Sequence, residues 1–201
     1  MTLLVLAPLR LEALAARSGL RGTDAEVVRT GMGPARSRAA AEALSSRNTG
    51  LGSARPVAVA GVCGGVEEGL CAGDVVVATA VRTEDGAERE LSQASVLALA
   101  DAVRGLGLRC TTGTVLSVER LHGDARRAAA GQESVVAVDM ESAWLADAAG
   151  DGPFAVLRVV ADAGGRSVYR PRTLVDGTRA LTALRRAVPA IAEWSQARTI
   201  D

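Results

Sequence analysis

Short, continuous runs of apolar residues alternate along the chain with longer segments whose apolar residues recur at helical spacing. Apolar runs of four to seven residues are typical of strands buried on both faces. Helical spacing, such as Leu11, Leu14 and Ala15 on one face, predicts helices between them. We expect strands at 3–6, 26–29, 56–60, 74–79, 112–118, 135–138 and 154–160, and helices at 9–17, 36–46, 91–106, 140–149 and 173–194, the last interrupted at Pro189.

This order of elements predicts an α/β protein, a three-layer α/β/α sandwich around a mixed, mainly parallel sheet, with residues 1–201 as a single domain. The polar segments 83–89 and 164–172 are expected to be surface loops, the second a lid. Ligands of such sheets bind beyond the carboxyl ends of the strands. Three carboxylates, on Glu12, Glu141 and Asp162, are therefore expected to converge there.

Composition excludes several classes of function. The chain has 201 residues, 48% hydrophobic, with 23 basic and 23 acidic side chains, so a large core is possible and no basic surface for nucleic acid is expected. All basic residues are Arg, which excludes Schiff-base catalysis and a P-loop lysine. A single His cannot form a His-rich metal site.

Targeting signals and disulfide patterns are also missing from the sequence. Cysteines 63, 71 and 110 are odd in number and lack CxxC spacing, which favours reduced thiols and a cytoplasmic protein. The N-terminal apolar run ends after about six residues, too short for a signal peptide. No apolar stretch approaches the roughly 20 residues of a membrane span.

Four motifs follow the strands in a fixed order. They are TGMGPA at 30–35, GVCGG at 61–65 with GDVVV at 73–77, VDMES at 138–142, and RVVAD at 158–162. Together they resemble the purine nucleoside phosphorylase and nucleosidase superfamily from residue 3 to about residue 165. They are similar to the nucleosidases that cleave methylthioadenosine and adenosylhomocysteine. TGMGPAR and VDMES also resemble the hopanoid-associated phosphorylases proposed to act on adenosylhopane.

The resemblance implies cleavage of a purine N-ribosidic bond through an oxocarbenium-like ribosyl cation. Asp162 matches the family's catalytic acid, which protonates the leaving base. Glu141 matches the residue that holds the ribose hydroxyls, and Met140 would pack on the sugar. Glu12 matches the carboxylate that activates water in the nucleosidase branch.

The resemblance also implies further contacts and partners. Gly33, Cys63 and Gly64 would line the purine nucleoside site from glycine-rich turns, and Leu121 stands near the place of the family's base-stacking aromatic. Arg10 and Arg36 are the candidates for phosphate. The phosphorylases carry an Arg just before the glycine-rich segment at 61–65 and a GDPxR turn near the N-terminus, and both are absent here. We therefore expect water rather than phosphate as the acceptor of the ribosyl group. The family implies a homodimer, and no cofactor or metal.

Each residue also has a plainer interpretation. Asp162 suits a turn before Gly164, Glu141 suits a first helical turn stabilised by the helix dipole, and Glu12 suits a solvated helix surface. Residues 61–65 suit a tight exit from a strand. Arg158, inside an apolar strand, is predicted to be the structural partner of a nearby carboxylate.

Two other function classes remain open at this point. One is a non-catalytic nucleoside-binding protein that retains the fold. Two features favour it: Val62 stands where the nucleosidases often carry Ser, and the base-stacking aromatic is missing at Leu121. The presence of Asp162 and Glu141 opposes it. A dinucleotide-binding domain would need a GxGxxG motif after the first strand, and none is present.

Overall fold

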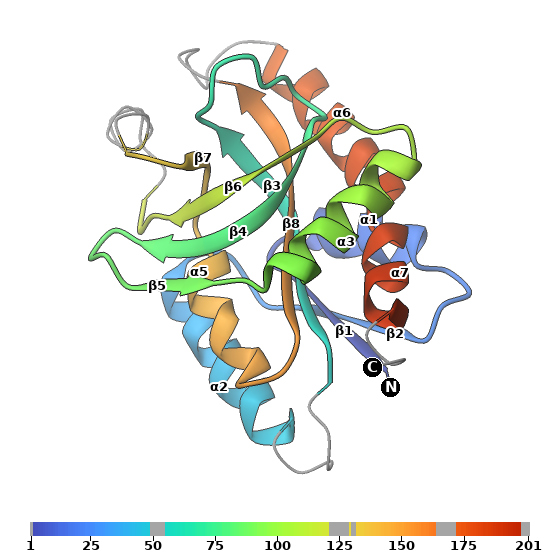
Figure 1. Cartoon of the computed structure of the whole chain (residues 1–201), viewed down its shortest axis with the longest axis vertical. Helices are drawn as coiled ribbons and strands as arrows, with labels where there is room; N and C mark the ends of the chain where they lie inside the picture. Colours follow the sequence, from blue (N-terminus) through green and yellow to red (C-terminus); the bar gives the residue numbers. More distant parts are fainter. Residues whose placement is uncertain (1, 49–54, 121–128, 130–131, 164–171, 198–201) are drawn as a thin grey trace.

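The computed structural model describes residues 2–48, 55–120, 129, 132–163 and 172–197 (Figure 1). The strands are β1 (Leu3–Ala7), β2 (Ala25–Arg29), β3 (Val57–Gly65), β4 (Val75–Thr83), β5 (Glu88–Glu90), β6 (Cys110–Ser117), β7 (Val135–Asp139) and β8 (Phe154–Ala163). The helices are α1 (Arg10–Gly19), α2 (Pro34–Asn48), α3 (Gln93–Gly105), α5 (Ser142–Leu145), the 3-10 helix η1 (Ala146–Ala149), α6 (Arg172–Ala187) and α7 (Pro189–Ala197).

The described strands form one mixed sheet in the order β2-β1-β3-β7-β6-β4-β5, and β8 pairs with both β3 and β4. β8 runs parallel to β3 and antiparallel to β4. The sheet therefore curls into a closed ring of strands in the order β3, β8, β4, β6 and β7. The ring is closed by antiparallel pairing of β7 with β3 at Gly64 and Gly65. This closure brings the end of β7 to the end of β3.

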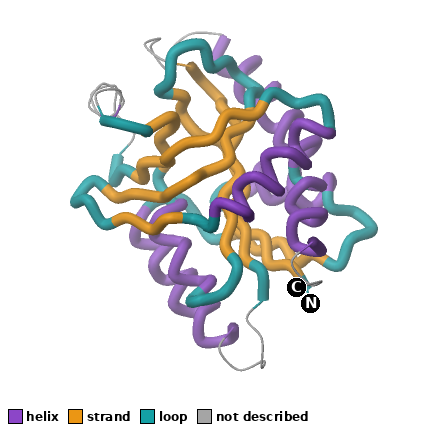
Figure 2. The backbone as a smooth tube through the Cα atoms, in the orientation of Figure 1, coloured by secondary structure: helices purple, strands orange, loops and turns teal. Residues whose placement is uncertain are grey.

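Helices cover both faces of the sheet, as the sandwich prediction requires (Figure 2). Buried side chains of α1, α3, α6 and α7 pack with one set of strand residues into one core cluster. α2, α5 and η1 pack against the other face in a second cluster. Figure 1 shows the first group of helices on the right and α2 with α5 at the lower left.

The sequence predicts nearly every strand, and the differences have local causes. The expected loop at 83–89 contains part of β5, which pairs antiparallel with β4 as a hairpin. The helix expected over 140–149 is shorter, because Glu141 is its N-cap residue with non-helical backbone angles (φ −144°, ψ −37°) and the last turn is 3-10. The lid expected at 164–172 falls almost entirely outside the described residues.

The buried face of α1 differs from the amphipathic pattern. Leu11 and Leu14 are 60% and 50% exposed, whereas Glu12, Ala13 and Ala16 are buried. Alanines let α1 pack closely on the neighbouring elements, and Glu12 turns inward because two backbone N–H groups bind its carboxylate. The plainer interpretation of Glu12, as a solvated residue on a helix surface, is therefore wrong.

Candidate active site

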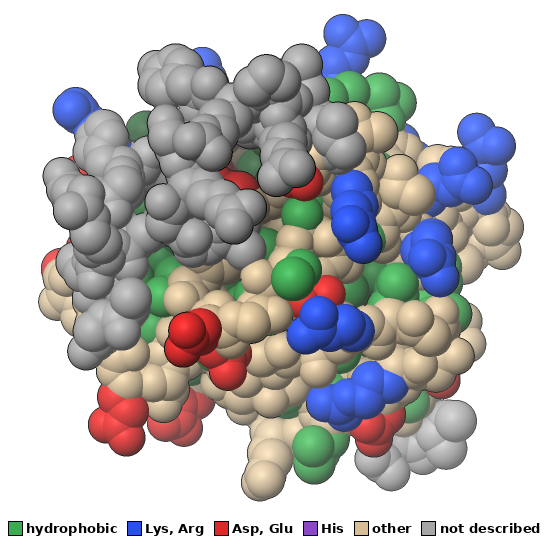
Figure 3. Space-filling model, turned by 90° about the horizontal axis from the view of Figure 1, so that it is seen from above, with side chains coloured by type: hydrophobic (Ala, Val, Ile, Leu, Met, Phe, Trp, Pro, Cys, Tyr) green, Lys and Arg blue, Asp and Glu red, His purple; other side chains and the backbone are tan. Residues whose placement is uncertain are grey.

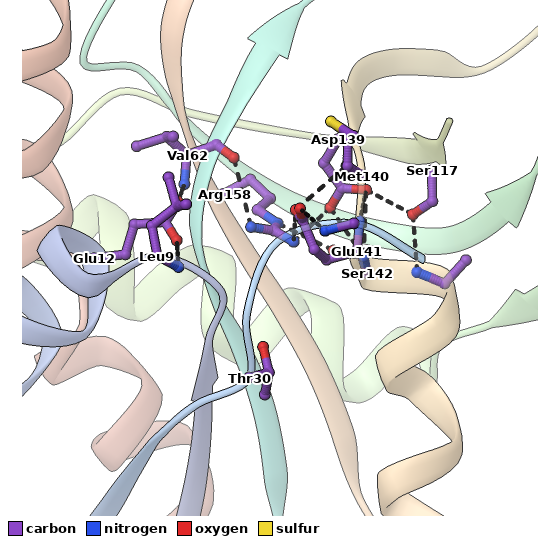
Figure 4. A network of polar contacts seen from close by, with 12 residues as sticks. Leu9, Glu12, Thr30, Val62, Ser117, Asp139, Met140, Glu141, Ser142 and Arg158 are labelled. Carbon is purple, nitrogen blue, oxygen red and sulfur yellow. Dashed lines mark hydrogen bonds and ion pairs between the residues drawn. The ribbon is translucent and has the colours of Figure 1, made fainter. Parts of the chain in front are cut away.

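A buried arginine organises the end of the sheet where β3, β7 and β8 meet (Figure 4). Arg158 of β8 has no exposed surface, and its Nη2 lies 2.6 Å from Asp139 Oδ2 and 3.6 Å from Glu141 Oε2. Its Nε donates to Ser142 Oγ at 3.0 Å, and its Nη1 donates to the Val62 carbonyl at 3.5 Å. The prediction that Arg158 is the partner of a nearby carboxylate is confirmed.

Asp139 fixes the start of α5 as well as the arginine. Its carboxylate accepts from the backbone N–H of Ser142 at 3.2 Å and of Glu141 at 3.2 Å. Ser117 of β6 donates to it at 2.6 Å and in turn accepts from the N–H of Ala143. Sequence analysis did not single out Asp139 or Ser117; the position of Asp139 just before a helix was the available signal for a capping residue.

Glu12 is held by two backbone donors from different elements. The N–H of Leu9 donates to its Oε2 at 2.7 Å, and the N–H of Val62 in β3 donates to its Oε1 at 2.7 Å. Because Val62 makes this contact through its backbone, a Val in place of Ser does not remove it. The carboxylate is 2% exposed and has a fixed orientation.

Glu141 bridges two motifs that lie far apart in the sequence. The N–H of Gly33 donates to its Oε1 at 3.1 Å, across 108 residues, and the N–H of Met140 donates to its Oε2 at 3.3 Å. Gly31 and Gly33 have φ values of +92° and +90°, which favour glycine in this turn. The Glu141 side chain is therefore fixed by the turn that holds Gly33, a contact that an ordinary carboxylate in a first helical turn would not need.

Burial and the charge of Arg158 act in opposite directions on the pKa values of Glu12 and Glu141. Burial, opposed by Arg158, raises the pKa of Glu12. Burial also raises the pKa of Glu141 to about 7, with Arg158 opposing and Asp139 reinforcing the shift. Burial would lower the pKa of Arg158, but the negative charges of Asp139, Glu141 and Glu12 raise it. Glu141 therefore changes charge near neutral pH.

Glu141 should lower the stability of the fold as the pH rises. An unfolded glutamate loses its proton near pH 4.5, whereas folded Glu141 keeps it until about pH 7, so stability falls across that interval. Glu141→Gln carries no charge at any pH. As the pH rises from about 5 to about 8, the melting temperature of Glu141→Gln relative to that of wild type should increase by at least about 3 °C. Thermal melts in matched buffers measure this gain, with Glu42→Gln on the exposed face of α2 as control. Parallel curves for wild type and Glu141→Gln would contradict it.

The glycines at 61–65 serve close packing rather than a turn. They lie within β3, in register with β8, and neither Gly61 nor Gly65 has a positive φ. A Cβ on Gly61 would stand 2.7 Å from Glu12 Oε1 and would collide with Arg158 Nη1. The expectation of a glycine-rich turn here is corrected: Gly61 makes room for the buried carboxylate and guanidinium.

Asp162 lies at the same end of the sheet, on β8. The β3–β8 register pairs Cys63 with Val160 and Gly64 with Asp162, so Ala161 is an extra residue in a bulge. Gly64 also pairs with Val138 of β7, and it therefore connects the strand of Asp162 to the strand that leads to Glu141. Bulges of this kind re-aim side chains beside active sites. Asp162 is half-buried, and Cys63 is buried on β3.

The remaining predicted residues are less closely tied to the network. Arg10 and Arg36 are exposed, and no hydrogen bond or ion pair joins either to another described residue; Arg36 packs over Gly31. Leu121 lies outside the described residues. No two cysteines of the described part of the chain form a disulfide.

In the described part of the chain, no group of three or more His, Cys, Asp or Glu side chains has the arrangement of a metal site. Within the same residues no helix combines the length and apolar character that crossing a bilayer requires.

The family model of the phosphorylase superfamily matches residues 15–191 of the chain. No curated protein gives a significant sequence match. The 5′-methylthioadenosine/S-adenosylhomocysteine nucleosidase of Neisseria meningitidis, in complex with methylthio-immucillin-A, has a similar structure: TM-score 0.77, 20% identity, covering 98% of this chain and 99% of that chain.

Two further solved structures are similar. That of the corresponding Colwellia psychrerythraea nucleosidase in complex with adenine has a TM-score of 0.79 and 21% identity, covering 98% of this chain and 95% of that chain. That of Helicobacter pylori futalosine hydrolase has a TM-score of 0.77 and 14% identity, covering 98% of both chains. At these identities the likeness is one of fold.

Proposed function

The chain belongs to the phosphorylase superfamily, and from that premise we propose that it hydrolyses the N-ribosidic bond of a purine nucleoside, with adenine as the leaving base. The observation that carries this proposal is the buried network in which Glu12 and Glu141 lie beside the buried guanidinium of Arg158. Structures of similar fold, described above, include nucleosidases that bind adenine or an adenine nucleoside analogue.

Glu12 is the group that activates the attacking water. Both of its oxygens are oriented by backbone donors, and burial raises its pKa, which makes the carboxylate a better proton acceptor. A positioned carboxylate can hold water against the anomeric carbon as positive charge develops on the ribose ring.

Glu141 and Asp162 act on the two sides of the bond that breaks. Glu141, when ionised, accepts hydrogen bonds from the ribose hydroxyls, which strengthen as the ring gains positive charge. Met140 packs against the apolar sugar face. Asp162 donates a proton to the leaving purine, so that the base departs neutral.

Charge favours water over phosphate as the acceptor. The network holds three carboxylates and one guanidinium, and Arg158 already contacts Asp139, Glu141, Ser142 and Val62. A phosphate dianion would meet an excess of negative charge. The candidate cations Arg10 and Arg36 are both exposed and make no ion pair to the network's described carboxylates.

The proposed substrate carries a bulky apolar group at the ribose 5′ position, as in adenosylhopane. Leu9, Leu11 and Met32 are exposed by 38%, 60% and 51% around the segments that precede Glu12 and Gly33. A hydrogen bond from the N–H of Gly31 to the carbonyl of Pro8 joins these segments. An apolar substituent would cover side chains that otherwise face water.

The products decide between hydrolysis and phosphorolysis. Incubation with 5′-substituted adenosines should release adenine and a free reducing sugar, at a rate that added phosphate does not change. Glu12→Gln should lower turnover by about 100-fold, since a neutral amide is a poor proton acceptor. Chromatography of adenine and of the sugar product provides the measurement, and a series of increasing 5′-alkyl length tests the apolar group.

The control for this variant is Glu42→Gln, on the exposed face of α2. A ribose 1-phosphate product that requires phosphate would overturn hydrolysis and move the role to Arg10 and Arg36. Nucleoside binding without any adenine release would instead support the non-catalytic alternative.

A further inference from the structure

A second cleft, separate from the carboxylate network, lies between α6 and the segments that lead into β4 and β6. Its volume is about 600 Å³, and its lining includes Gly73, Asp74, Arg109, Arg179, Thr182 and Arg186. None of the residues assigned to the reaction lines it. Figure 3 shows the molecule from above, and Arg side chains gather on the right half of the face seen in that view.

The lining of this cleft carries more positive than negative charge, with three arginines and one aspartate. Arg109 Nη1 lies 3.3 Å from Asp74 Oδ2, and Arg109 Nη2 donates to the Gly69 carbonyl. Asp74 is 7% exposed and also accepts from the N–H of Cys71. Arg179 and Arg186 make no hydrogen bond or ion pair with another described residue. Two guanidiniums at this cleft are therefore without a described carboxylate partner.

The positions of the arginines suit one small ligand. Arg179 and Arg186 are seven residues apart on α6, which puts them on one helix face about 10 Å apart along its axis. Arg109 stands on the opposite wall, as the residue just before β6. Thr182 lies between the two helix arginines on their wall, and its hydroxyl donates to the Thr178 carbonyl, so the arginines are the groups available to a ligand there.

We propose that this cleft binds a small phosphorylated anion with at least two phosphate charges, such as a diphosphate group, held between Arg109 and the two arginines of α6. Guanidinium groups bind phosphate oxygens in a bidentate manner, and Arg suits this role better than any other side chain. The volume lies in the usual range for small-molecule sites and is too limited for a nucleic-acid groove.

The floor of the cleft is bonded to the strand that carries Asp162. The N–H of Gly73 donates to the Val160 carbonyl at 2.8 Å, and the N–H of Val160 donates to the Asp74 carbonyl at 2.9 Å. The Arg179 side chain lies over Gly73, 3.4 Å from where a Cβ would stand. An anion that moves Arg179 therefore acts on Gly73, which is hydrogen-bonded to Val160 of β8. Val160 lies two positions before Asp162. The effect on turnover that follows rests on the proposed function; binding does not.

Binding is tested by calorimetric titration with pyrophosphate, inorganic phosphate and adenosine diphosphate at low ionic strength. Wild type should bind pyrophosphate and adenosine diphosphate more tightly than phosphate. Arg179→Ala/Arg186→Ala should weaken both by at least about tenfold. Arg185→Ala, an exposed arginine of α6 outside the lining, should leave them unchanged. Equal affinities in all three proteins would contradict the proposed anion site. So would binding of adenosine diphosphate through its base alone, with no contribution from its phosphates.

Turnover is tested separately on the same proteins. Saturating pyrophosphate should change kcat or KM of wild type and of Arg185→Ala by about fivefold or more, and should not affect the double variant. An effect that persists in the double variant would place pyrophosphate elsewhere, and no effect on wild type would overturn the link to β8. Failure of every form to release adenine would count against the proposed function, while the titrations would still decide the site.

Discussion

Asp162→Asn is expected to lower turnover by about 100-fold or more while leaving nucleoside binding within a few-fold of wild type. An asparagine at the end of β8 retains the size and hydrogen-bonding capacity of the carboxyl group but has no acidic proton for the leaving purine. Adenine release under saturating nucleoside measures turnover, and titration with an unreactive nucleoside analogue measures binding. The split between the two separates a catalytic acid from a residue that only shapes the pocket.

The matched control is Asp151→Asn. Asp151 is exposed and precedes β8 at the opposite end of the strand from Asp162. Its substitution should change neither measurement. If Asp162→Asn turned over substrate within a few-fold of wild type, Asp162 would have no part in proton transfer, and another donor to the base would have to be sought.

Arg158→Met should cost about 3–5 kcal/mol of unfolding free energy, because it leaves three buried carboxylates without their cation. Arg82→Met provides the comparison. Arg82 lies 2.6 Å from Glu88, the same separation as Arg158 and Asp139, but both members of the Arg82–Glu88 pair are partly exposed. Its loss should cost about 1 kcal/mol or less. Urea denaturation of both variants measures the difference that burial makes.

The pH dependence gives this comparison a second readout. Without Arg158 the buried carboxylates hold protons more tightly in the folded state than in the unfolded state, so the folded state is favoured as the pH falls. The deficit of Arg158→Met should therefore shrink between about pH 8 and about pH 5, whereas that of Arg82→Met should change little. A deficit that stays constant would mean that lost packing, rather than unpaired charge, destabilises the variant.

Local pattern alone identified most of the architecture. Continuous apolar runs predicted the buried strands, and helical spacing predicted the helices. Arg158 was also predicted to be the structural partner of a nearby carboxylate, and Asp139 has that place. The family resemblance, rather than local pattern, indicated the two carboxylates, Glu12 and Glu141, that the fold brings to Arg158. The strands and helices depend on neighbouring residues and on the short periods of helix and strand, which a sequence displays directly.

The tertiary structure decided which groups meet and which way they face. Glu12 turns inward and Leu11 outward because Val62, 50 residues away, supplies a backbone donor to the carboxylate. Glu141 reaches Gly33 across 108 residues because antiparallel pairs between β3 and β7 close the ring of strands. Such contacts depend on strand register and on the need of each buried charge for a partner, and both are properties of the assembled chain rather than of any local segment.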